Sequence, residues 1–205
     1  MTREEMLSDL AYARTLAEEG RNAPLVGGSF SVLFGVLLAI CYAAQWAVLT
    51  GVWPVDGDVI GYVWIGFGVC ALIGSALLSA RVRGMPGAAA IPNRVDRTVW
   101  QGVAIAILAV VAGTIARAIA QNDYTAPNAI VAAGFGLYGV ALYATATVGG
   151  HTWLRAFAFT SWLVSCLMWY FLGEPWLYLL AAAASAVVLI VPGLVMMRRE
   201  PKTVV

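Results

Sequence analysis

Six apolar segments, each long enough to cross a lipid bilayer, constrain the fold of this chain more than any other feature. A helix needs about 20 apolar residues to span a hydrocarbon core about 30 Å thick, because its backbone finds no water to bond with there. The six segments are 25–50, 59–80, 98–120, 128–148, 152–172 and 176–197. Stretches rich in Pro, Gly and polar residues separate them. The sequence therefore predicts an all-α, polytopic integral membrane protein with six transmembrane helices.

The overall composition agrees with a membrane protein. Hydrophobic residues make up 61% of the 205 residues and charged residues only 11%, whereas soluble domains average about 45–50% and about 25%. This apolar excess excludes a water-soluble domain and a disordered chain, and three cysteines are too few for a disulfide scaffold. Two similar fragments, at 65–68 and 133–136, suggest a repeated unit, so we expect three consecutive helical hairpins.

Basic residues predict the orientation of the helices, because cytoplasmic loops retain Lys and Arg. Eleven of the 12 basic residues fall on one side of the predicted bundle, and only Arg117 falls near the other. The acidic residues on that opposite side are Asp56, Asp58, Asp123 and Glu174. We therefore expect a multi-pass protein of the cell (inner) membrane with both termini in the cytoplasm.

The residues ahead of the first span read as a separate element. The sequence divides into an acidic amphipathic cytoplasmic helix at 1–22, a six-helix bundle at 23–198 and a cytoplasmic tail at 199–205. Thr2 and Glu5 are spaced as a capping box. The apolar side of the helix consists of Met6, Leu10, Ala13 and Ala17. Its net acidic charge disfavours anionic lipid, so we expect it to dock on protein. The candidates are the basic second loop, with Arg81, Arg83, Arg94 and Arg97, and a cytosolic partner.

A stripe of small residues runs along the first span at four-residue intervals. Its members are Gly27, Ser31, Gly35, Ala39, Ala43 and Ala47. Inside lipid, small residues let helices approach closely, and this packing replaces the missing hydrophobic force. We expect another helix in this groove, either from the same bundle or from a second copy of the chain.

Aromatic and polar residues gather toward the acidic side of the bundle. A belt of aromatic rings at headgroup level explains most of them. The alternative is a site for a lipid, quinone or pigment, which would be lined by Gln45, Trp46, Trp64, Arg117, Trp169 and Trp176. For Arg117, the two interpretations are a guanidinium that extends to the interface and an anion contact, with Asp123 as a candidate partner.

No arrangement of residues predicts catalysis, a cofactor or a metal site. The middle of every span lacks Asp, Glu, Lys, Arg and His, which usually mark proton or substrate pathways. His151 is the only histidine and stands at a membrane edge, and Cys41, Cys70 and Cys166 form no CxxC pair. Phosphate-loop and nucleic-acid-binding patterns are also missing. We therefore predict no catalytic residues and no nucleic-acid partner.

Three functional hypotheses remain. The first is a non-enzymatic structural or regulatory membrane subunit, which contacts identical copies or other chains through its helices and its cytoplasmic helix. The second is a channel or transporter for a small neutral or apolar solute, which needs no buried charge. The third is a membrane module that binds a lipid, quinone or pigment at the aromatic side.

Overall fold

The computed structural model describes residues 6–7, 12, 24–123 and 125–200. These residues contain helices and no strand. The elements are α2 (Gly28–Leu49), α3 (Val59–Arg83), α4 (Ile91–Gln121), α5 (Asn128–Val148), α6 (Leu154–Tyr170), α7 (Trp176–Ser185), the π-helix η1 (Ala186–Ile190) and α8 (Val191–Arg199). The last three follow without interruption and form one rod, Trp176–Arg199. The all-α prediction is confirmed for the described residues.

Five of these elements are long and apolar enough to cross a membrane. They are α2, α3, α4, α5 and the rod from α7 to α8. The predicted fifth span, 152–172, corresponds to α6, which has 17 residues and is therefore about 25 Å long. The described residues thus form a helical membrane protein with five clear candidate spans.

The helix boundaries agree to within a few residues with those predicted from the sequence, except at the start of α4. The fourth predicted span, 128–148, coincides with α5, whereas the third was predicted to begin at 98 and α4 begins at Ile91. Pro92 lies in the first helical turn, where a missing N–H costs nothing, so it begins the helix instead of breaking it. The prediction of a basic loop is therefore wrong. Arg81 and Arg83 lie on α3, and Arg94 and Arg97 lie on α4.

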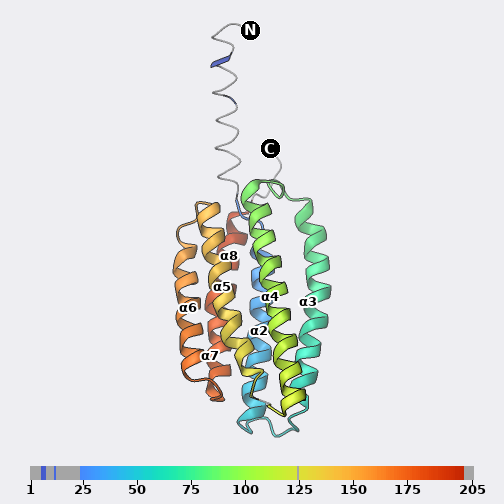
Figure 1. The fold of residues 1–205 in the computed structure, drawn as a ribbon. Coiled ribbons are helices and arrows are strands. Elements are labelled where there is room, and N and C mark those ends of the chain that lie inside the picture. Colours follow the sequence, from blue (N-terminus) through green and yellow to red (C-terminus); the bar gives the residue numbers. More distant parts are fainter. Residues whose placement is uncertain (1–5, 8–11, 13–23, 124, 201–205) are drawn as a thin grey trace.

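Successive rods run in opposite directions, which gives the bundle two chemically different ends (Figure 1). We call the end where α2 begins and α8 finishes the arginine-rich end. Its arginines are Arg81, Arg83, Arg94, Arg97, Arg155, Arg198 and Arg199. The opposite end, with Asp56, Asp58, Asp123 and Glu174, is the acidic end.

The predicted hairpins are only partly packed as pairs. α2 packs against α3, and α4 packs against α5. The third pair separates, because α6 packs mainly against α5 and the rod packs mainly against α2. α3 and α4 make little contact with each other and lie on one side of the bundle (Figure 1).

Burial within the chain is very uneven. In the most apolar 18-residue window of each helix, 56% of α5 and 44% of the rod are buried, against 6% of α3 and 11% of α4. The core therefore lies between α2, α5, α6 and the rod, and its largest fully buried side chains include Phe135, Leu142, Leu154, Met168 and Leu189. α3 and α4 leave several large apolar side chains exposed, such as Leu72 and Ile105.

The predicted N-terminal helix is only partly described. Met6 is helical and exposed. Leu10, Ala13 and Ala17 lie outside the described residues. Docking of this helix therefore stays a prediction.

Candidate functional site

The small-residue stripe of α2 lies partly against the rod. A Cβ atom at Gly28 would lie 2.6 Å from the carbonyl oxygen of Gly193, and one at Gly35 would lie 2.7 Å from Cγ1 of Ile190. At Gly193, an added Cβ would lie 3.0 Å from the Cβ of Ser31. These distances leave no room for a side chain. α2 and the rod thus approach to backbone contact at three glycines.

The other members of the stripe have different surroundings. An added Cβ at Gly27 would lie 2.8 Å from Oδ2 of Asp96 on α4. Ala43 packs against the main core, and Ala39 and Ala47 are half-buried. The stripe therefore faces two different elements along its length.

A π-helical turn in the rod accompanies this close approach. The N–H of Val191 bonds to the carbonyl of Ala186, five residues back, just before Pro192. Proline has no N–H and its ring clashes with the carbonyl four residues earlier in a regular α-helix. A π turn relieves such a clash by inserting an extra residue. Pro192 therefore explains where the helix changes its period.

Three side chains of α6 bond to the backbone of α5. Ser161 Oγ donates to the carbonyl of Phe135 at 2.6 Å, and Ser165 Oγ donates to that of Ala132 at 2.7 Å. Trp162 Nε1 donates to the carbonyl of Gly136 at 3.1 Å. Polar side chains of this kind hold transmembrane helices together. Sequence reasoning missed them, although the four-residue spacing of the two serines is a usable signal.

A buried amide joins α4 to the start of α2. Asn93 Oδ1 accepts a hydrogen bond from the N–H of Val26 at 3.0 Å. Asn93 Nδ2 donates to the carbonyls of Pro24 and Gly87, each at 2.9 Å. The side chain is only 3% exposed, and three bonds satisfy most of its capacity. Asn93 therefore fixes the segment ahead of α2 and the loop ahead of α4 to one point.

One turn further along α4, a carboxylate bonds to α5. Thr145 Oγ1 donates to Asp96 Oδ1 at 2.6 Å. Sequence reasoning missed this pair because it placed Asp96 in a loop. The helical period starting at Pro92 puts Asn93, Asp96 and Trp100 on one side of α4, and this spacing could have revealed the pair.

The residues predicted to line a ligand site at the acidic side lie in different surroundings. Trp64 Nε1 donates to Gln45 Oε1 at 2.8 Å, so these two meet. Trp46 packs against the core, while Trp169 and Trp176 are exposed. Arg117 Nε lies 2.9 Å from Asp123 Oδ2 in an exposed ion pair. The pKa of the Asp123 carboxyl lies below its usual range, mainly because Thr125 Oγ1 donates to it and secondly because Arg117 does.

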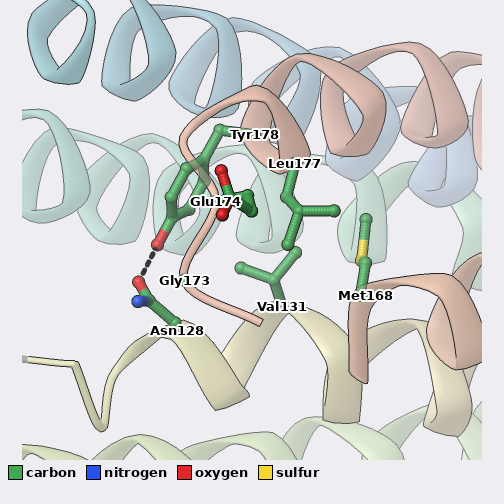
Figure 2. Close-up of a pocket in the computed structure, with 7 residues that line it drawn as sticks. All are labelled: Asn128, Val131, Met168, Gly173, Glu174, Leu177 and Tyr178. Carbon is green, nitrogen blue, oxygen red and sulfur yellow. Dashed lines mark hydrogen bonds between the residues drawn. The ribbon is translucent and has the colours of Figure 1, made fainter. Parts of the chain in front are cut away.

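A small cavity lies at the acidic end (Figure 2), and its lining includes none of the residues predicted to form a ligand site. Its lining residues are Asn128, Val131, Met168, Gly173, Glu174, Leu177 and Tyr178. Tyr178 donates its hydroxyl hydrogen to Asn128 Oδ1 at one side of the cavity (Figure 2). The volume is about 10 Å³, which is room for about one water molecule. This cavity is too small for a quinone, a pigment or a lipid chain.

α4 carries a second line of small residues that nothing covers. Gly102, Ala109, Gly113, Ala116 and Ala120 lie within an arc of about 60° of the helix surface. All five are exposed, and no atom lies within 4 Å of an added Cβ at Gly102 or Gly113. We call this line the open face of α4. It has the composition of a helix contact and lacks a neighbour within the described residues.

The described residues contain no group of three or more His, Cys, Asp or Glu side chains that could hold a metal ion. No protein-family model, no curated protein and no solved structure matches this chain.

Proposed function

We propose that this protein is a non-catalytic, structural or regulatory subunit of the cell membrane, which associates laterally with another chain or a second copy through α3 and α4. The observation that carries the proposal is the open face of α4. Glycines in α2 are in backbone contact with the rod, whereas Gly102 and Gly113 of α4 have no neighbour within 4 Å. Small residues of transmembrane helices are typical of contacts with other helices.

The low burial of α3 supports the same proposal. Within the described residues, α3 packs mainly against α2. Its exposed residues include Gly61, Gly66 and Gly68, and no atom lies within 4 Å of an added Cβ at any of them. α3 is attached through α2 and α4 through α5. Together they offer a broad surface to a neighbour in the membrane. Each of the two cavities described here is lined by residues from one end of the bundle, which favours association over passage of a solute.

The proposal includes a topology of six spans with both termini in the cytoplasm. α6 serves as the fifth span, because it runs beside α5 over most of the length of the bundle (Figure 1). The seven arginines of the arginine-rich end support a cytoplasmic location for that end. A reporter that fluoresces only in the cytoplasm, fused after Val205, should be active. A periplasmic phosphatase reporter at the same position should be inactive, and the reverse result would contradict this topology.

Replacing Gly113 by Leu tests the association. The side chain meets nothing inside the chain, so the monomer should fold normally, but it fills the open face of α4. The control is Ala104→Leu, because Ala104 is also exposed on α4 and lies about 180° around the helix from Gly113. The mass of the complex, purified from its own membranes in mild detergent, is measured by native mass spectrometry.

We expect the wild type and A104L to carry additional protein mass and G113L to be a monomer. A monomeric wild type, or equal behaviour of the two variants, would overturn the proposal. Spectra that contain a second copy identify a homo-oligomer, and spectra with a different chain identify a membrane complex.

A further inference from the structure

A second cavity lies at the arginine-rich end, and none of its lining residues belongs to α4. Its volume is about 190 Å³. It is lined by Pro24 and Leu25 ahead of α2, by His151 and Trp153 between α5 and α6, and by Met196 and Arg199 of α8. Three separate parts of the chain therefore meet around one space. The proposed association through α3 and α4 uses none of these residues.

Two of the lining side chains have polar atoms without partners. His151 Nε2 and Trp153 Nε1 are buried and form no hydrogen bond with any described residue. Trp153 Nε1 carries a hydrogen, and neutral His151 carries one on one of its two ring nitrogens. Buried N–H groups are almost always satisfied in native proteins, because leaving one unpaired forfeits its bond to water. A ligand atom that accepts hydrogen bonds would remove this deficit.

The charge around the cavity is positive. The guanidinium carbon of Arg199 lies 5.4 Å from the centroid of the Trp153 ring, so the cation and the indole share one side of the space. None of the lining residues is acidic. Glu200 follows Arg199 but does not line the cavity, and burial raises the pKa of its carboxyl. The lining thus complements an anion that accepts hydrogen bonds.

The rest of the lining is apolar and lies at the depth of lipid headgroups. Pro24, Leu25 and Met196 supply this apolar part. Arginines and tryptophans at the end of a bundle mark the membrane–water boundary, and basic pockets between helices there suit anionic headgroups. The cavity is smaller than the 300–1,000 Å³ typical of sites for drug-sized ligands, so it suits one headgroup. We propose that it binds a phosphate group, presented by the headgroup of an anionic phospholipid.

Two lining residues and one neighbour provide the test. Arg199→Gln removes the charge, and Trp153→Phe removes the indole N–H but keeps a ring beside residue 199. Arg198→Gln is the control, because Arg198 is exposed, carries the same charge and does not line the cavity. Full-length proteins in detergent are titrated with phosphatidylglycerol, phosphatidylcholine or inorganic phosphate. Binding is followed by native mass spectrometry and by the shift in Tm.

We expect phosphatidylglycerol to bind the wild type and R198Q equally within about twofold. Its affinity should fall about tenfold in R199Q and several-fold in W153F, because each change removes a charge-assisted or buried hydrogen bond. Phosphatidylcholine should bind the wild type more weakly than phosphatidylglycerol. The Tm of each protein is also measured without lipid, which separates loss of binding from loss of folding.

The arms of the titration also distinguish the source of the phosphate. Stabilisation by inorganic phosphate, lost in R199Q, would assign the site to free phosphate. Equal losses of affinity in R198Q and R199Q, or no preference for phosphatidylglycerol over phosphatidylcholine, would overturn the proposal. Attraction of anionic lipid would then be a general property of the arginine-rich end. The result is independent of the oligomeric state, so this proposal and the proposed association can fail separately.

Discussion

The small-residue faces of α2 and α4 have similar compositions and opposite surroundings. On α2, added Cβ atoms at Gly28 and Gly35 would collide with the rod, whereas on α4 such atoms at Gly102 and Gly113 would meet nothing. The rod returns to α2 although it is the last element of the chain. A stripe of small residues therefore identifies a surface for helix contact, and the path of the rest of the chain decides whether that surface is filled.

The largest expected effect comes from placing the same side chain on the two faces. Gly35→Leu forces four carbon atoms into a space where Cγ1 of Ile190 and Cβ of Leu189 lie 2.7 and 2.9 Å from the first of them. Overpacking at this level should cost about 3 kcal/mol of stability. Gly113→Leu should change the free energy of unfolding of the monomer by less than about 0.5 kcal/mol. Unfolding in detergent, followed by tryptophan fluorescence, measures the stability of both variants. Equal losses in G35L and G113L would contradict the difference between the two faces.

A smaller effect is expected where α4 is attached. Thr145→Val keeps the shape of the side chain but removes the hydrogen bond to Asp96, which leaves a carboxylate oxygen without its partner. A bond to a charged group contributes about 1.5–3 kcal/mol, so we expect a loss of about 2 kcal/mol in the same unfolding assay. Thr147→Val is the matched control, because Thr147 bonds only to the carbonyl of Tyr143 in its own helix. A similar loss in both variants would show that the contact with α4 contributes little.

The smallest effect concerns the dependence of stability on pH, through His151 near the end of α8. Burial, and secondly the charge of Arg199, hold the pKa of His151 below its ordinary value of 6.5. The unfolded chain then binds a proton at a higher pH than the folded chain does. The contribution of neutral His151 to stability is therefore complete above about pH 7 and is lost as the pH falls from 6.5 toward the folded-state pKa. His151→Gln should weaken the dependence of Tm on pH between 7 and 5.5, and an unchanged dependence would exclude this origin.

The sequence predicted the helices well and their neighbours poorly. The limits of α5 were predicted to the residue, because hydropathy and flanking breakers act within one segment. The start of α4 was misplaced, because Pro92 begins a helix in one context and breaks it in another. That single error moved Asn93 and Asp96 into a loop, so both polar contacts of α4 at the arginine-rich end were missed.

By itself, the sequence determined that this protein belongs in a lipid bilayer, that it is helical, and how charge is distributed between its two ends. These properties follow from hydropathy and backbone hydrogen bonding, which are satisfied within each segment. Only the tertiary structure decided that the rod fills the groove of α2, that Ser165 reaches the backbone of α5 and that α4 keeps an open face. Several helices offer similar small residues, and the choice among them depends on close contacts between parts of the chain that are distant in sequence.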